Sequence, residues 1–332
     1  MTAGSKVRAT RLFRAVTQAL LLASLATIVI SISNSLLGRE DNPETITLGI
    51  FLSHWTWDPI VLLPLLFISV AYIAGRRRLR IQAPGAMAAG RTFYMAAALI
   101  TLFLALVSPI DTYATDLLSI HMAQHLLLMM VAAPLLLLAN PMATILWGLP
   151  AAWRLDVGRR FTRHGFLRRL LQVLTRPRLA WFTFAGVTYL WHIPNAYDTA
   201  LRYQSIHYLQ HLTMFGAGLL FWWPVIGAPP VRSRLSYPAR WVYLLLAAAQ
   251  TVPLGIMLTF SSTVWFPSYT FTTAAWGIAP LEDQHLGGLI MWVGGKTIHV
   301  LALTVLFFAW CHHEEDQQSE PAQRYLSQQP GL

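Results

Sequence analysis

Residues 119–138 read S-I-H-M-A-Q-H-L-L-L-M-M-V-A-A-P-L-L-L-L. These 20 residues contain no Asp, Glu, Lys or Arg, and as a helix they would reach about 30 Å, the thickness of the hydrocarbon core of a bilayer. Inside lipid every backbone polar group must be satisfied within its own segment, so such a stretch has to be helical. The stretch therefore predicts a transmembrane helix that begins with two histidines.

The rest of the chain repeats this pattern. Of its 332 residues 55% are hydrophobic and 11% charged, whereas soluble domains carry about 25% charged residues. We expect an all-α polytopic membrane protein with about eight transmembrane helices, a seven-helix core and an additional N-terminal helix. The predicted spans are 13–33, 58–75, 91–108, 119–138, 178–194, 205–226, 241–261 and 286–310. The predicted divisions are an N-terminus with its extra helix (1–40), the membrane core (41–311) and a polar cytoplasmic tail (312–332).

The distribution of charge predicts the orientation. With both termini in the cytoplasm, 21 of the 24 Lys and Arg fall on the cytoplasmic side, as the positive-inside rule requires. Nine of the 14 acidic residues fall on the outer side. The net charge of +10 is therefore a topology signal and a contact with anionic lipid, and we expect no nucleic-acid partner. No A-x-A-like cleavage site follows the first span, so we expect it to be retained as an anchor.

A histidine motif occurs twice at an offset of 86 residues. The pattern S-I-H-x-x-Q-H-L opens the fourth span at 119–126 and the sixth span at 205–212, and a shorter echo, Q-H-L, opens the last span at 284–286. Histidines four residues apart lie on one face of a helix. The two full repeats therefore predict two pairs of imidazoles at the same depth in the membrane.

Seven of the eleven histidines are predicted to lie in this outer layer. Ionisable residues inside membrane spans are costly and usually functional, which favours a metal site over an interfacial role. The candidate ligands are His54, His121, His125, His192, His207, His211 and His285.

The residue types favour copper, as Cu(I), among the metals that imidazole binds. Met122 adjoins the first pair, and Met129 and Met214 lie about one turn further along their helices; thioether sulfur beside imidazole favours Cu(I) over zinc or iron. H-M-A-Q-H lacks the glutamate of the H-E-x-x-H zinc-protease motif, and no other motif predicts an enzyme. Two alternatives stay open. One is a haem-binding redox protein, because histidines on two helices can ligate haem. The other is a metal or proton transporter with an inner path at Lys296 and His299.

Four stretches of the chain resemble the bacterial CtaG family, the membrane-integral assembly factors of caa3-type cytochrome c oxidase. They are H-M-A-Q-H at 121–125 with A-P-L at 133–135; L-W-H-I-P at 190–194 with Tyr197 and Asp198; His207 onward to F-W-W-P at 221–224; and Asp283-Gln284 with G-G-L-I-M-W at 287–292. The resemblance covers about residues 55–310.

The resemblance implies a seven-helix core in a bacterial plasma (inner) membrane and a non-enzymatic role in maturing a haem–copper oxidase. It implies delivery of copper to the oxidase, with subunit I as the expected recipient and another copper chaperone on the outer side as a further partner. His121, His125, His192, His207 and His211 match motif positions of the family, whereas His54 and His285 are candidates by their position alone.

Overall fold

The computed structural model describes residues 48–83, 89–161 and 165–327, and every regular element within them is a helix. The predicted first span, 13–33, and the basic residues before it lie outside the described residues. The helices are α2 (Leu48–Ser53), α3 (Pro59–Gln82), α4 (Ala89–Val107), α5 (Pro109–Tyr113), α6 (Leu118–Leu126), η1 (Leu127–Ala132), α7 (Ala133–Ala139), α8 (Met142–Gly148), α9 (Ala151–Arg160), α10 (Phe166–Leu174), α11 (Pro177–Trp191), α12 (Pro194–Arg202), α13 (Gln204–Ile226), α14 (Tyr237–Gln250), α15 (Val252–Phe260), η2 (Pro267–Tyr269), η3 (Thr273–Trp276), α16 (Pro280–Leu289), η4 (Ile290–Gly294) and α17 (Gly295–Ser327).

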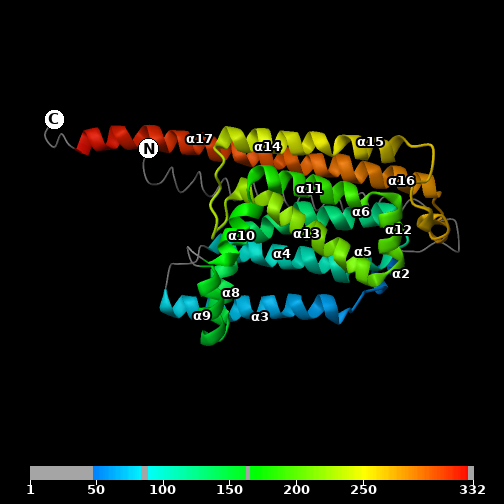
Figure 1. Cartoon of the computed structure of the whole chain (residues 1–332), viewed down its shortest axis with the longest axis horizontal. Coiled ribbons are helices and arrows are strands. Elements are labelled where there is room, and N and C mark those ends of the chain that lie inside the picture. The colour runs from blue at the N-terminus through cyan, green and yellow to red at the C-terminus, as the bar shows by residue number, and fades with distance from the viewer. Residues whose placement is uncertain (1–47, 84–88, 162–164, 328–332) are drawn as a thin grey trace.

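The long helices run side by side along the long axis of the molecule (Figure 1). Within the described residues, six continuous helical segments are long and apolar enough to cross a membrane, which confirms the prediction of a polytopic helical membrane protein. The six are Pro59–Gln82, Gly90–Tyr113, Leu118–Ala139, Gln204–Ile226, Tyr237–Phe260 and Pro280–Glu315.

The predicted span at 178–194 appears as α11, which has only 15 residues. At 1.5 Å per residue it is about 22 Å long, shorter than a typical bilayer core. The helix ends at Trp191 because Pro194 follows closely, and the residue before a proline is pushed out of the helical conformation. Pro194 then begins the short helix α12.

The continuous segment α6–η1–α7, which opens with the first histidine repeat, lies at the centre of the bundle. Of the 18 residues in its most apolar stretch, 83% are buried inside the protein, whereas in the corresponding stretch of the peripheral helix α3 the share is 17%. Helix α13, which opens with the second repeat, packs directly on η1 at Gly218, where an added Cβ would lie 2.9 Å from Cα of Met129. The absence of a side chain at Gly218 therefore brings the two repeat helices into backbone contact.

Two of the membrane segments contain a wide π-helical turn. In η1 the amide of Ala133 donates to the carbonyl of Leu128, five residues back, and Pro134, which has no N–H to donate, follows directly. The second π-turn, η4, lies between α16 and α17. Such turns occur frequently at functional sites, and both of these line the same internal cavity, as described below.

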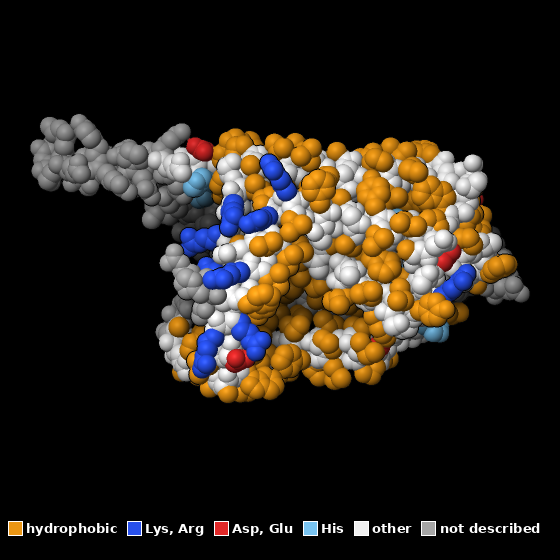
Figure 2. All heavy atoms as spheres, viewed as in Figure 1, with side chains coloured by type: hydrophobic (Ala, Val, Ile, Leu, Met, Phe, Trp, Pro, Cys, Tyr) orange, Lys and Arg blue, Asp and Glu red, His pale blue; other side chains and the backbone are white. Residues whose placement is uncertain are grey.

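The two ends of the bundle differ in charge. Lys and Arg gather at the end where α8, α9 and α10 cross the bundle (Figures 1 and 2); we call this the basic end. The opposite end, where α6, α13 and α16 begin, is called the histidine end. The positive-inside rule predicts that the basic end faces the cytoplasm.

Candidate metal centre

Four histidines from the two repeats meet inside the histidine end. We call His121 and His125 of α6 and His207 and His211 of α13 the four-histidine cluster. Within each helix the two imidazole ring centroids lie 4.3 Å apart on α6 and 4.2 Å apart on α13. Between α6 and α13 the ring centroids of histidine pairs lie 5.3–6.2 Å apart. All four side chains are buried. The structure therefore brings the paired imidazoles of the two repeats together.

The phenol of Tyr269 orients His121. Tyr269 Oη donates to the carbonyl of Ala114 at 2.9 Å, and burial holds the pKa of Tyr269 well above its ordinary value, so this proton is retained. Because the phenol has only one proton, His121 Nδ1, 2.9 Å from Tyr269 Oη, must donate to it. This fixes the tautomer of His121 with Nε2 unprotonated, the form that a metal ligand needs.

The cluster contains ring nitrogens that face one another and ring nitrogens that have no hydrogen-bond partner among the described residues. His121 Nε2 lies 3.0 Å from His125 Nε2, close to the distance of about 3.3 Å between two nitrogens bound at about 2.0 Å to one tetrahedral metal. His125 Nδ1, His207 Nε2 and His211 Nε2 are buried and have no hydrogen-bond partner among the described residues. His121, His125 and His211 each place one ring nitrogen within 4.8 Å of the other two. The cluster thus fits a metal ion.

His192 lies beside the cluster and faces a methionine. Its Nδ1 donates to the carbonyl of Thr188 at 2.6 Å, so Nε2 of a neutral ring carries a lone pair. That nitrogen lies 3.4 Å from Sδ of Met122. Neither atom carries a proton in this tautomer, so the pair presents two lone pairs to the same space.

Two predicted ligands lie outside the cluster. His54, in the loop after α2, is exposed and its Nδ1 contacts the carbonyl of Ile50 and Oη of Tyr113. His285 of α16 is half-buried, with Nε2 2.8 Å from the carbonyl of Ser261. The structure therefore brings together five of the seven predicted histidines: the cluster and His192.

Three aromatic side chains close the histidine end over the cluster. Tyr197 of α12 and Phe266 and Tyr269 of the 261–279 connection are each no more than 2% exposed; we call them the aromatic cover. Tyr197 packs against the His121 ring at 5.0 Å and against Phe266 at 4.3 Å between ring centroids. Sequence reasoning had identified Tyr197 only as part of a family motif and had missed the other two, because no periodic pattern marks a loop that folds back over a site.

Asp283 of α16 fixes the start of the first repeat helix, a role that the sequence did not reveal. Helix α6 has Leu117 at its N-cap, which offers no side-chain acceptor. The buried Asp283 carboxylate instead accepts from the amides of Leu118 (2.6 Å) and Ser119 (3.2 Å) and from Ser119 Oγ (2.5 Å). A carboxylate at a helix N-terminus satisfies free amides and complements the helix dipole.

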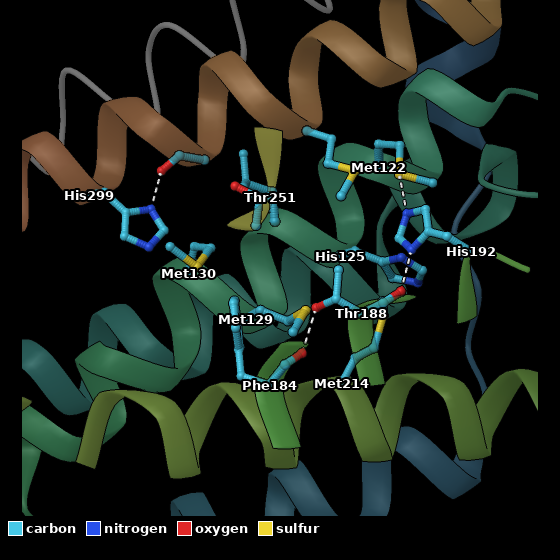
Figure 3. Close-up of a pocket in the computed structure, with 13 residues that line it drawn as sticks. Met122, His125, Met129, Met130, Phe184, Thr188, His192, Met214, Thr251 and His299 are labelled. Atoms are coloured by element: carbon cyan, nitrogen blue, oxygen red, sulfur yellow. Dashed lines mark hydrogen bonds between the residues drawn. The ribbon is translucent and has the colours of Figure 1, made fainter. Parts of the chain in front are cut away.

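An internal cavity of about 50 Å³ continues from the cluster into the bundle. Figure 3 shows His192 and Met122 at one end of it and His299 at the other. His125 joins the cavity to the cluster, because it belongs to the cluster and also lines the cavity. Lys296, three residues before His299, instead lies over the ring of Trp292 and approaches the carbonyl of Ala248 at 3.5 Å.

Comparison with known proteins gives a family match. A family model described as cytochrome c oxidase caa3 assembly factor matches residues 70–313, a range that contains all of the cluster and the cavity. Uncharacterized proteins of Mycobacterium bovis and Mycobacterium tuberculosis are each 27% identical over 82% of this chain and 42% of their own length. An uncharacterized protein of Mycobacterium leprae is 26% identical over 80% of this chain and 40% of its own length. The chain thus spans about two-fifths of the length of these relatives. No solved structure matches.

Proposed function

The chain belongs to the cytochrome c oxidase caa3 assembly factor family, and from this premise we propose that it binds Cu(I) at the four-histidine cluster and delivers it to the oxidase. It is a multi-pass protein of a bacterial membrane, and its family gives it an oxidase as partner. Copper is the cargo in this proposal, and the protein acts by binding and transfer without catalysing a reaction.

The observation that carries the proposal is the set of bare nitrogens in the cluster. Buried polar atoms in proteins are almost always hydrogen-bonded, because an unpaired one costs about 1–3 kcal/mol. Here His207 Nε2 and His211 Nε2 are buried without a partner among the described residues, while His121 Nε2 and His125 Nε2 face one another at 3.0 Å. A metal bound between the rings would take one nitrogen from each histidine that it contacts.

The surroundings favour Cu(I) over a divalent metal. Imidazole and thioether, the groups that meet at His192 and Met122, suit Cu(I). No carboxylate belongs to the group of His121, His125 and His211. A divalent ion in this buried layer would therefore keep more uncompensated charge than a monovalent one, at a higher desolvation cost.

The alternative of a haem protein has less support from the geometry. The rings of the two repeat helices lie against one another with centroids as close as 5.3 Å. The adjoining cavity has a volume of about 50 Å³, whereas sites for cofactors and other small molecules usually measure about 300–1,000 Å³. A porphyrin would have to separate the helices, which Gly218 holds in backbone contact.

The proposed direction of transfer follows from the predicted orientation. If the basic end faces the cytoplasm, the cluster lies near the outer surface, at about the depth that the family resemblance implies for the oxidase's binuclear copper. We propose that subunit I receives the ion and that a second copper chaperone supplies it from outside. Asp58 and Asp111, both near the histidine end, would attract cations to this surface.

The test compares a double variant, His121→Ala with His207→Ala, with the wild type. We expect the variant to accumulate normally, to bind less Cu(I) after purification under reducing conditions, and to leave the host oxidase short of copper. Excess external copper should partly restore oxidase activity, because occupancy follows mass action. The control is His313→Ala, which removes an exposed histidine of α17 far from the cluster.

Full oxidase assembly by the double variant in copper-poor medium would contradict the proposal. An intense Soret absorbance in the purified wild type, lost in the double variant, would assign the cluster to haem instead. If the double variant does not accumulate, the conservative change His207→Gln gives the same test with a smaller loss of packing.

A further inference from the structure

Half of the methionines in the chain line the internal cavity beside the cluster. The sequence contains ten methionines, and the five that line the cavity are Met122, Met129, Met130, Met214 and Met291. They come from three separate segments: α6 with η1, α13, and η4. Met residues often fill irregular gaps in a core, but these surround a space that remains open. The concentration of thioethers around one cavity needs a chemical explanation.

The geometry at the mouth of the cavity provides one. His192 Nε2 and Met122 Sδ lie 3.4 Å apart, and no proton stands between them. Two such atoms bound to one tetrahedral metal, at about 2.0 Å for nitrogen and 2.3 Å for sulfur, would lie about 3.5 Å apart. The observed separation thus matches a chelating pair before any metal is bound.

We propose that the methionine-lined cavity is a second Cu(I) site, distinct from the four-histidine cluster, with His192 Nε2 and Met122 Sδ as its first ligands. The proposal rests on the proposed copper function, because His125 connects the two sites. The cavity volume of about 50 Å³ exceeds the roughly 10–15 Å³ that one water molecule needs on the same measure, so it accommodates an ion. Its lining contains no carboxylate, which favours a monovalent soft cation.

The cavity also gives the ion a route away from the cluster. The carboxylate of Asp283 accepts a hydrogen bond from the amide of Ser119, so α16 and α6 begin at the same height along the bundle axis. His299 lies 16 residues beyond Asp283, and His125 lies six beyond Ser119. At 1.5 Å per residue, His299 is about 15 Å deeper in the bundle. Figure 3 shows Met129 and Met130 between these two levels.

His299 has a ring nitrogen available to bind an ion at the inner end of that route. Its Nδ1 donates to the carbonyl of Gly295 at 2.8 Å, and its buried Nε2 has no hydrogen-bond partner among the described residues. The π-turns η1 and η4 contribute Met129, Met130 and Met291 to the lining. The cavity therefore offers a series of neutral nitrogen and sulfur ligands from the histidine end toward the middle of the membrane.

The experiment uses the full-length protein labelled with selenomethionine and loaded with Cu(I) under anaerobic conditions. X-ray absorption at the selenium edge reports copper bound to a methionine side chain and cannot be confused with copper bound to Cys311. Copper per chain is measured in parallel by competition with a Cu(I) chelator. The variants are Met122→Leu, the double variant His121→Ala with His207→Ala, and the control Met95→Leu, which changes a buried methionine far from the cavity.

We expect about two Cu(I) per wild-type chain, with a selenium–copper signal. Met122→Leu should bind about one and lose most of that signal, whereas the histidine double variant should bind about one and keep it. Met95→Leu should match the wild type. Because Leu and Met have similar volumes, Met122→Leu should still fold.

The outcomes separate the two proposals. A wild type that binds Cu(I) with no selenium–copper signal would overturn the cavity site and leave the cluster proposal standing. The opposite result, in which Met122→Leu removes all Cu(I) and the histidine double variant removes none, would overturn the cluster proposal and support the cavity site.

Discussion

The two copies of S-I-H-x-x-Q-H-L have the same sequence pattern but different surroundings. In the first copy, Asp283 caps the helix, Tyr269 orients His121, and Gln124 Nε2 donates to the carbonyl of Ala105 and to Asp111, both at 2.8 Å. In the second copy the N-cap residue Tyr203 makes no side-chain cap bond among the described residues. Both polar atoms of the Gln210 side chain are buried without a hydrogen-bond partner among the described residues.

The difference indicates a division of roles within the cluster. The copy on α6 is the more pre-organised of the two, because Tyr269 holds His121 and Asp283 holds the start of the helix whether or not a ligand is bound. It still has two buried atoms, Gln124 Oε1 and His125 Nδ1, without a hydrogen-bond partner among the described residues. The copy on α13 keeps bare polar atoms, and ligand binding would satisfy the two ring nitrogens among them. A site built from one fixed half and one half that gains its partners on binding can hold an ion and also release it. Variants that affect only one half test this interpretation.

The largest loss of stability is expected when Asp283, the cap of the first repeat helix α6, is removed. Asp283→Ala leaves the buried amide of Leu118 and the half-buried amide and hydroxyl of Ser119 without their acceptor, and the buried amide alone costs about 1–3 kcal/mol. We expect a lower thermal midpoint of unfolding in detergent and reduced accumulation in the membrane. The control is Glu282→Ala, which removes the exposed neighbouring carboxylate that caps only its own helix. Equal midpoints for the two variants would show that the cap does not stabilise α6.

The glutamines of the two repeats should respond in opposite ways. Gln124→Leu removes the side-chain donor to the carbonyl of Ala105 and one of the donors to Asp111, and should cost about 1–3 kcal/mol of stability. Gln210→Leu removes an amide that has no hydrogen-bond partner in the described part of the chain, so it should be neutral or stabilising. Thermal unfolding of the metal-free protein measures both. A loss at Gln210 equal to that at Gln124 would mean that the two halves are equally fixed.

A smaller effect, on Cu(I) affinity, is expected when His121 alone loses the hydrogen bond that orients it. Tyr269→Phe keeps the ring in the aromatic cover but removes the acceptor that fixes the tautomer of His121. Loss of such a supporting hydrogen bond typically lowers metal affinity about 10- to 100-fold. Competition with a Cu(I) chelator measures the change, with Tyr203→Phe, an exposed tyrosine before α13, as the matched control. Unchanged affinity in Tyr269→Phe would mean that the cluster does not depend on this tautomer.

The smallest effect is expected outside both repeats. Lys296 is half-buried over Trp292 and does not line the cavity. We expect Lys296→Met to support normal oxidase assembly in copper-poor medium. If assembly fails while the protein accumulates normally, Lys296 and His299 would instead form part of a proton or ion relay.

The sequence predicted the elements better than their mutual contacts. Apolar length located the six membrane segments, and the four-residue spacing placed His121 with His125 and His207 with His211. The role of Asp283 could not be read from the sequence, because it depends on a contact with a helix 165 residues away in the chain. The π-turns escaped prediction as well, since they follow the same apolar pattern as regular helix.

His285 shows that a three-residue echo of the repeat does not bring its histidine into the cluster. The echo Q-H-L at 284–286 keeps the glutamine and the histidine but lacks the first histidine of the full repeat. In the structure, Asp283 and Gln284 are buried, and the side chain of Gln284 accepts a hydrogen bond from the amide of Trp265 and donates one to the carbonyl of Thr263. The next residue, His285, is turned toward Ser261 instead of the cluster. The orientation of a helix about its axis depends on its neighbours, which three residues do not determine.

The aromatic cover would affect how fast copper enters and leaves the cluster rather than how tightly the cluster binds it. Tyr197, Phe266 and Tyr269 are almost fully buried, and Tyr197 and Tyr269 contact His121, so we expect an ion to pass His121 into solution only when this part of the molecule moves. Motions of loops and lids take from nanoseconds to milliseconds or longer, and the exchange rate of the cluster would follow the opening of the cover instead of the diffusion of copper. A recipient that displaces the 261–279 connection would then accelerate release without changing a single ligand, and the ion would stay sequestered during the interval between donor and acceptor.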